Sequence, residues 1–346
     1  MSAHRGNPQS DSREDVMRLR AVKSLLVTGA SALTLAACGG GGGMSFIPAP
    51  PVTPTPAPSP TPTPTPPPVT SQADATIFAH PTPGDYATVG VTSQTAPLDT
   101  IAAFGPLSTA QSEQVHIRYT SGGFYEVQLP GRDWDRLVTD KGTSASNPAD
   151  LNILQPSLAP QNLELIIIGQ ARKQGYQYSE IASWFDRVAV KSGQFAFGVA
   201  TPLGAVPITG NAAYHGIASG TTDIVGSDGW GGYNVGLKGT VDLNFDFAAG
   251  SLAGAMTLAL DDYTGGNPVG TFSFKDTVFS AGSPTYSGKF DTPVAGDNFF
   301  LGQFTGPHAE ETIGAWALPF VYSNGTTSAP ADNKVHQAIG AWIAKP

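Results

Sequence analysis

From residue 210 to the C-terminus, apolar and polar side chains alternate along a series of short segments. The clearest is 236–247 (GLKGTVDLNFDF), in which Leu237, Val241, Leu243, Phe245 and Phe247 alternate with Lys238, Thr240, Asp242, Asn244 and Asp246. Successive side chains of a β-strand point to opposite faces of its sheet. This period therefore predicts a strand with one face on a core and the other face in water.

Eight segments of this kind follow one another. They are 211–217, 236–247, a run from Met256 to Leu260, a run around Phe272 and Phe274, 285–290, 298–305, 313–322 and 335–344. An antiparallel meander of eight strands keeps two free edges unless its first and last strands pair, and closure into an up-and-down barrel removes both edges. The polar face of 238–246 excludes the outward apolar band that a membrane-spanning barrel needs. We predict a closed, water-soluble, eight-stranded antiparallel barrel over residues 208–346.

Residues 76–207 show a less regular pattern. The segment 116–129 predicts a hairpin that turns at residues 121–123, 163–168 predicts a buried strand, and β-forming residues fill 176–190 and 195–199. Residues 133–160 are polar and lack a helical period, so we expect loops there. We predict a small, irregular antiparallel region without a helix, which makes the chain all-β.

The N-terminal 37 residues form a secretory signal. Three basic residues (Arg18, Arg20 and Lys23) precede an apolar run of about 14 residues, which is shorter than the roughly 20 needed to cross a bilayer. The run ends in LAAC, which resembles the bacterial lipobox, and this resemblance implies that Cys38 is acylated and that residues 1–37 are removed. A glycine rather than an aspartate after Cys38 implies the outer membrane. Met17 is our candidate for the true start.

Residues 38–75 form a linker. Five glycines follow Cys38, and prolines then alternate largely with Thr, Ser or Ala from Pro48 to Pro68. Proline fixes φ and favours polyproline II, so about twenty residues at a rise of about 3.1 Å would extend roughly 60 Å. A stalk that presents the folded part away from the membrane and a simple periplasmic spacer both fit this composition.

Charge and cysteine content exclude several classes of protein. Lys and Arg number 18 against 27 Asp and Glu, and removal of residues 1–37 leaves 13 basic and 24 acidic residues, a net charge of −11. Such a chain lacks the basic surface that binds nucleic acid. One cysteine excludes a disulfide framework and Cys-based metal sites.

Catalytic and metal-binding patterns are missing from the sequence. It contains no G-x-S-x-G, H-E-x-x-H or phosphate-loop motif. The adjacent Asp261 and Asp262 would point to opposite faces of a strand and are assigned to a turn rather than to a pair of glycosidase carboxylates. We assign His80, His116, His215, His308 and His336 to the surface, and we predict a protein that is not an enzyme and holds no metal.

Residues 302–316 (GQFTGPHAEETIGAW) resemble the barrel signature of transferrin-binding protein B, usually written G-x-F-Y-G-P-x-A-x-E-x-G-G-x-F. The matching positions are Gly302, Phe304, Gly306, Pro307, Ala309, Glu311 and Gly314. Thr305, Ile313 and Trp316 depart from the pattern. Residues 200–216 are also similar to the segment that begins such barrels, whereas over 76–199 only position suggests the handle-like region of that family. We assign the motif to the fold, with Glu311 as an acceptor near the turn.

The resemblance implies a surface-exposed lipoprotein that a dedicated translocon exports and that captures host iron or haem proteins, or haem, for a TonB-dependent receptor. It does not carry ligand contacts residue by residue. If haem binds, the candidate ligands are His215, His308, Tyr176 and Tyr178, because haem iron takes His or Tyr. Trp230 and Tyr233, in a glycine-rich loop, are candidate binding anchors or caps of the barrel. The alternatives are a periplasm-facing structural or small-ligand carrier lipoprotein and, third, an enzyme of unknown type.

Overall fold

The computed structural model describes residues 75–77, 80–95, 104–108, 115–139, 154–156, 163–167, 170–186, 191–227, 232–261, 267–323 and 331–346. The signal, Cys38 and the proline-rich linker lie outside these residues. The described chain is all-β, as predicted, except for one helical turn, α1 (Gln170–Lys173). Within the same residues, no helix has the length and apolar character to cross a membrane.

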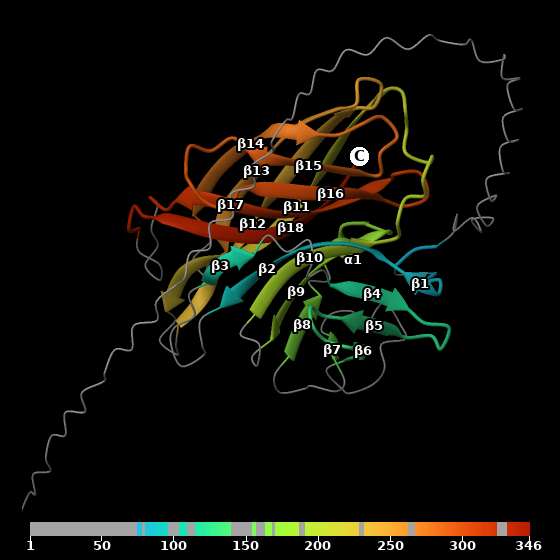
Figure 1. Ribbon diagram of the computed structural model, residues 1–346, viewed down its shortest axis with the longest axis horizontal. Coiled ribbons are helices and arrows are strands. Elements are labelled where there is room, and N and C mark those ends of the chain that lie inside the picture. Colours follow the sequence, from blue (N-terminus) through green and yellow to red (C-terminus); the bar gives the residue numbers. More distant parts are fainter. Residues whose placement is uncertain are drawn as a thin grey trace, which may run out of the picture. The chain divides into compact units, whose positions relative to one another are not determined.

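The C-terminal region forms a closed barrel of eight antiparallel strands, which confirms the predicted fold (Figure 1). Its strands are β11 (Asn211–Ser227), β12 (Gly232–Asp246), β13 (Ser251–Asp261), β14 (Pro268–Val278), β15 (Thr285–Phe290), β16 (Phe299–Thr305), β17 (Glu311–Val321) and β18 (Val335–Lys345). The first and last strands pair from His215 opposite Lys345 to Thr222 opposite Ala338, which closes the sheet. The first strand is longer than expected and continues to Ser227.

The barrel interior is filled by aromatic and aliphatic side chains. Along β12, Val241, Leu243 and Phe245 are buried and face inward, while Asp242 and Asn244 are exposed, as the alternation predicts. The ring of Phe245 lies 4.8–5.8 Å from five other aromatic rings. An eight-stranded barrel encloses just enough room for its own side chains, and here large ones occupy it.

The region before the barrel forms an open ten-stranded antiparallel sheet, in the order β1-β4-β5-β6-β7-β8-β9-β10-β2-β3. Its strands are β1 (Gly84–Asp85), β2 (Ala87–Thr95), β3 (Phe104–Ser108), β4 (His116–Tyr119), β5 (Tyr125–Gln128), β6 (Trp134–Thr139), β7 (Leu154–Pro156), β8 (Leu163–Ile167), β9 (Ser179–Asp186) and β10 (Lys191–Gly198). The predicted hairpin and the strands near 163–168, 176–190 and 195–199 are present. Residues 133–160, expected as loops, contain β6 and β7, because strand pairing stabilises short segments that lack an apolar period of their own.

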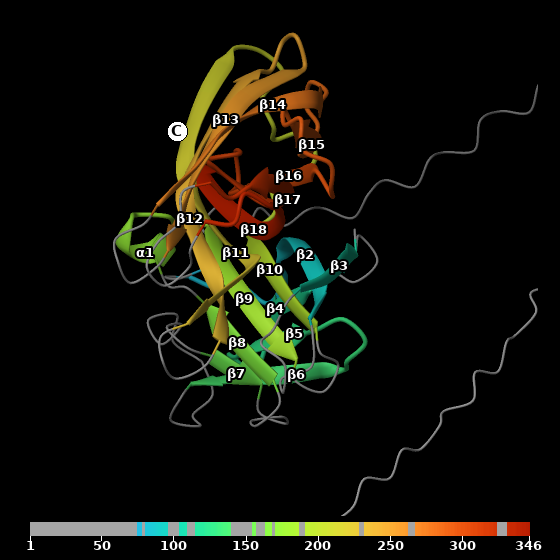
Figure 2. The same cartoon turned by 90° about the vertical axis from the view of Figure 1, so that its left-hand side faces the viewer.

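The sheet packs on the outer face of β17 and β18 (Figures 1 and 2). The outward residues of these two strands join the core of the sheet: Ile313, Ala315, Ala317, Ile339, Ala341 and Ile343. Both faces of β17 and β18 are consequently buried, whereas β12 and β13 keep an exposed outer face. The sheet and the barrel thus share one hydrophobic core along these two strands.

Candidate functional site

The motif resembling the family signature forms a tight turn between β16 and β17. Gly306 has φ +86°, a conformation that glycine adopts without a steric cost, and Pro307 follows it. Ala309 also has a positive φ, +62°, and its carbonyl accepts a 2.6 Å hydrogen bond from the buried Tyr214 hydroxyl. Burial raises the pKa of Tyr214 to about 12. This bond fixes the turn against the first barrel strand.

Two motif glycines leave room for aromatic rings inside the barrel. Gly302 and Gly314 lie opposite each other on β16 and β17. A Cβ at Gly302 would come within 2.1 Å of the Tyr286 ring, and a Cβ at Gly314 within 2.1 Å of the Trp342 ring. The two rings lean across the glycines, and the Trp342 indole N–H lies 3.4 Å from the Tyr286 hydroxyl. Motif glycines therefore serve the packing of the barrel.

The turn is also bonded to the chain that joins the sheet to the barrel. The Gly306 N–H donates to the Val199 carbonyl at 2.8 Å, and the Thr201 hydroxyl donates to the Gly306 carbonyl at 2.8 Å. The buried hydroxyls of Ser179, on β9, and Thr305, on β16, are 2.7 Å apart. The motif turn is thus one side of the junction between the two β regions.

Glu311 lies at the centre of this junction and is only 3% exposed. Its carboxylate accepts the backbone N–H of Gln177 at 2.6 Å and of Tyr178 at 3.1 Å, both from the segment that links α1 to β9. Burial raises the pKa of Glu311 to about 7, although these bonds and the charge of Lys345 oppose the rise. The motif acid binds the sheet region rather than a ligand.

Glu180, on β9, is a second buried carboxyl near the junction, and sequence reasoning missed it. It is fully buried, and its Oε1 accepts the Ile181 N–H at 2.9 Å, while Oε2 has no hydrogen-bond partner among the described residues. Burial is the main cause that raises the pKa of Glu180 to about 7; the backbone N–H groups of Ile181 and Ala171 oppose the rise, and the charge of Glu311 supports it. Glu180 lies in an ordinary strand segment, SEIASW, which carries no motif.

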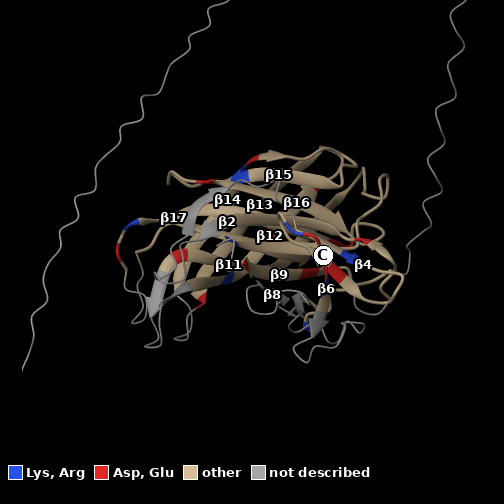
Figure 3. Ribbon diagram, turned by 60° about the horizontal axis from the view of Figure 1, so that its bottom comes forward, with Lys and Arg blue, Asp and Glu red and all other residues tan. Residues whose placement is uncertain are grey.

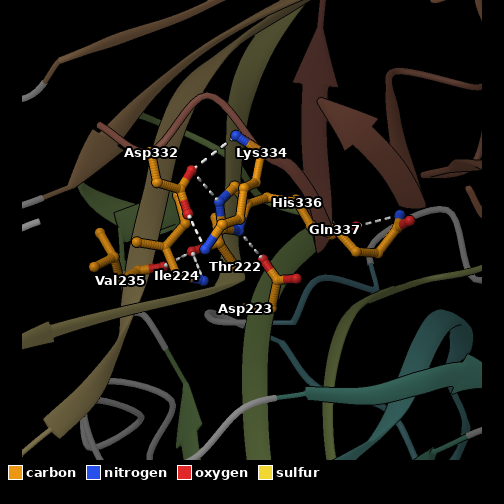
Figure 4. Close-up of polar contacts among 9 residues, drawn as sticks. Thr222, Asp223, Ile224, Val235, Asp332, Lys334, His336 and Gln337 are labelled. Atoms are coloured by element: carbon orange, nitrogen blue, oxygen red, sulfur yellow. Dashed lines mark hydrogen bonds and ion pairs between the residues drawn. The ribbon is translucent and has the colours of Figure 1, made fainter. Parts of the chain in front are cut away.

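A cluster around His336 ties β18 to β11 (Figure 4). The imidazole Nδ1 is 2.8 Å from Asp223 Oδ1, and Nε2 is 3.0 Å from Asp332 Oδ1. The His336 side chain is only 13% exposed, so the expectation of a surface residue is wrong for it. The hydrogen bond from His336 is the main cause that lowers the pKa of Asp332. Because 113 positions separate Asp223 from His336, no local pattern in the sequence could reveal their contact.

The four candidate haem ligands lie in two different environments. His215 is exposed on the outer face of β11, with Nδ1 2.6 Å from Asp242, and His308 is exposed in the motif turn. Tyr176 and Tyr178 belong to the junction: the Tyr176 hydroxyl donates to the Ile343 carbonyl at 3.2 Å, and Tyr178 packs beside Gly306.

Other predicted site residues are not described. Trp230, Cys38 and the Tyr233 side chain lie outside the described residues, although the backbone of Tyr233 belongs to β12. Asp262 is outside them too, while Asp261 forms an exposed ion pair with Lys238 at 2.9 Å. The described residues hold no group of three or more His, Cys, Asp or Glu side chains arranged for a metal ion.

An open groove of about 450 Å³ lies where β2 passes β15 and β16. Its lining carries no charged residue, and Ser, Thr and Gln make up half of it, while apolar and aromatic side chains and one glycine make up the other half. Charged side chains are also sparse on the barrel strands, which Figure 3 draws mostly in tan.

Comparison with known proteins finds similarity in solved structures only. No family model and no curated protein match the chain. HpuA from Kingella denitrificans, solved in complex with human haemoglobin, is 12% identical, and the match covers 77% of this chain and 90% of HpuA with a TM-score of 0.37. A transferrin-binding protein B double mutant from Haemophilus parasuis is 14% identical over 71% of this chain, with a TM-score of 0.32, and this chain spans 54% of its length. A protein described as a surface lipoprotein is 14% identical over 74% of this chain and 98% of its own, with a TM-score of 0.34.

Proposed function

We propose that this chain is a lipid-anchored, non-enzymatic binding protein of the outer membrane, exposed at the cell surface, which captures a host or environmental protein for iron or nutrient uptake. The lipobox at Cys38, the proline-rich linker and the motif that resembles transferrin-binding protein B support this proposal. It includes export by a surface-lipoprotein translocon and transfer of the captured nutrient to a TonB-dependent receptor.

The observation that carries the proposal is the filled interior of the barrel. Among the described residues, rings such as Phe245, Phe304 and Trp316 occupy the space in which a carrier barrel would hold its ligand. A closed barrel with a packed core and a second sheet on one side is a rigid support, and a partner must bind to its outer surface or loops. This disfavours the alternative of a small-ligand carrier and favours display to a protein partner.

Free haem fits the described residues less well than a protein ligand. Haem iron binds tyrosine as the phenolate, and burial raises the pKa of Tyr176, which opposes that form. His215 and His308 are both exposed; the His215 ring is bonded to Asp242, and the His308 backbone N–H donates to Glu310. We therefore keep Trp230, in the connection between β11 and β12, and Tyr233, near the start of β12, as the proposed contacts for a protein.

Cell-surface exposure is tested by protease treatment of intact cells that express a tagged chain. We expect cleavage of the wild type on intact cells, and loss of membrane association in Cys38→Ser because its thiol can no longer be acylated. Protection on intact cells together with cleavage after lysis would instead place the protein on the periplasmic side.

Ligand capture is tested with the full-length chain carrying Cys38→Ser, immobilised and exposed to host serum, haemoglobin, transferrin and haem in separate channels. We expect saturable binding of a protein, weakened by Trp230→Ala and Tyr233→Ala and unchanged by Lys238→Ala on the outer face of β12. Binding of haem alone, at a stoichiometry near one, would overturn the preference for a protein ligand.

A further inference from the structure

Two buried carboxyls meet the segment that joins α1 to β9. Glu311 reaches this segment from β17 and accepts the N–H groups of residues 177 and 178. Glu180 follows the same segment on β9 and accepts the N–H of Ile181. Both side chains are almost or fully removed from water. Residues 177–181 therefore combine three features of the sheet–barrel junction: they continue the chain into β9, they donate hydrogen bonds to Glu311, and they include the buried Glu180.

Few compensating charges face these carboxyls. Among the described residues, Lys345 of β18 is the cation whose charge acts on Glu311; its Nζ donates to the Gln174 carbonyl at 2.7 Å and lies 4.9 Å from the centre of the Tyr176 ring. Tyr176 also faces Glu311 from the linking segment, and the two acids face each other. Lys173 of α1 is exposed to solvent. When both acids ionise, the two carboxylates repel each other, and the charge of Lys345 acts on Glu311. Among the described residues, Oε2 of Glu180 has no hydrogen-bond partner.

We propose that Glu180 and Glu311 form a proton-dependent latch between the sheet and the barrel, closed while these carboxyls hold a proton and loosened when both ionise. The opened state is one in which residues 174–181 leave β17 and expose both carboxyls to water. The latch does not depend on the identity of the captured ligand, and it would let a change of pH near neutrality alter how firmly the sheet is held.

The direction follows from linkage. Each acid has a pKa of about 7 in the closed junction and an ordinary value of 4.5 when exposed. The closed junction therefore binds protons that the open junction releases, and raising the pH from about 4.5 to about 7 favours opening. Each group contributes on the order of a hundredfold to the opening equilibrium over this range, and above it no further change is expected.

Amide hydrogen exchange of the full-length Cys38→Ser chain tests the latch. After correction for intrinsic exchange, we expect the opening equilibrium of the Gln177, Tyr178 and Ile181 amides to rise at least about tenfold between pH about 5.5 and about 8.5. Amides in the middle of β13, far along the barrel, should not follow this rise.

Glu180→Gln keeps the size of the side chain and removes its charge, so it should lose a large part of the pH-dependent rise. Asp133→Asn, which neutralises an exposed acid just before β6, is the matched control and should behave as wild type. Glu311→Gln provides the same comparison if Glu180→Gln does not fold. Opening that is independent of pH, an equal rise in β13, or an unchanged rise in the folded glutamine variant would each overturn the latch.

Discussion

Single residues show how the barrel interior combines glycines with large rings. Gly302 faces Tyr286, and Gly314 faces Trp342, across neighbouring strands. Gly340 faces Trp316 in the same manner, and a Cβ added at Gly340 would lie only 2.1 Å from the Trp316 ring. Each ring occupies the volume that a neighbouring side chain would otherwise fill. The close packing of the interior therefore depends on the absence of a single carbon atom at several positions.

Gly314→Ala should destabilise the protein by about 1–3 kcal/mol, because its Cβ would overlap the Trp342 ring and both strands are fixed by their neighbours. Chemical unfolding of the variant measures this loss. Gly236→Ala is the control, since its Cβ would lie 3.6 Å from its nearest neighbour, an ordinary contact, and it should be neutral or slightly stabilising. Equal losses in the two variants would contradict the packing argument.

His336→Phe should cost about 1–3 kcal/mol, because phenylalanine keeps a ring beside Phe320 and Tyr322 but removes the imidazole that bonds Asp223 and Asp332, of which Asp332 keeps Lys334 as a partner. The loss should appear as faster hydrogen exchange at residues 331–335. His215→Phe makes the same change in an exposed pair and should cost less than about 0.5 kcal/mol. A larger effect at His215 would refute the role of burial in this pair of sites.

Contacts between distant residues explain why much of the site was beyond sequence reasoning. The motif identified Glu311 in the sequence, and its position beside a turn predicted that its carboxylate accepts hydrogen bonds there. Its donors are separated from it by more than 130 positions, Asp223 lies 113 positions from His336, and Glu180 carries no local signal. Such constellations form only when the sheet and the barrel have folded.

At the scale of strands, the barrel was predictable and the sheet was only partly so. The alternation in β12 fixes one buried and one exposed face, and repeated segments of the same kind indicate closure. In contrast, β7 has three residues and β1 has two, too few to establish any period. Such strands exist because a neighbouring strand supplies their hydrogen bonds, which is information that their own residues do not contain.

The sequences of β17 and β18 indicate that both faces of these strands are buried. Apolar residues run almost continuously through ETIGAWALPFV and AIGAWIA, where an exposed barrel strand would place polar residues at every second position. The inward set, such as Trp316 and Leu318, packs in the barrel, and the outward set, such as Ala315, packs on the sheet. A run that breaks the alternation of its neighbours thus marks the strand that another layer covers.

Ala315→Glu should therefore destabilise the protein by several kcal/mol, since it buries a charge in the shared core, or it should prevent folding. Ala253→Glu, the same substitution on the exposed face of β13, should change stability by less than about 0.5 kcal/mol. Thermal unfolding of the two variants measures the contrast, and soluble yield reports it if Ala315→Glu does not fold. Comparable stability of the two variants would refute burial of the β17 outer face.

At the scale of the whole folded region, the sheet and the barrel depend on one shared core. The barrel is closed and satisfies its own backbone hydrogen bonds, yet its outer face carries Ile313, Ile339 and Ile343 where the sheet lies. An apolar patch of this kind, once uncovered, promotes association. The barrel therefore closes its own hydrogen-bonded sheet, but part of its outer face is apolar and needs the second sheet to cover it. Removing that second sheet tests this dependence.

A chain reduced to residues 208–346 should self-associate, because removal of the sheet exposes the three isoleucines. Ile313→Thr, Ile339→Thr and Ile343→Thr together should restore a monomer, since threonine keeps the β-branched shape and suits a water-facing strand. In the complete chain the same triple change should instead cost about 1–3 kcal/mol at each site, because the sheet loses its contacts. Sedimentation measures association of the short chains, and chemical unfolding measures stability of the complete ones. The triple change should help the short chain and harm the complete chain only if the outer face of β17 and β18 belongs to a shared core. A triple variant that improves both chains, or harms both, would show that the barrel does not rely on the sheet to cover it.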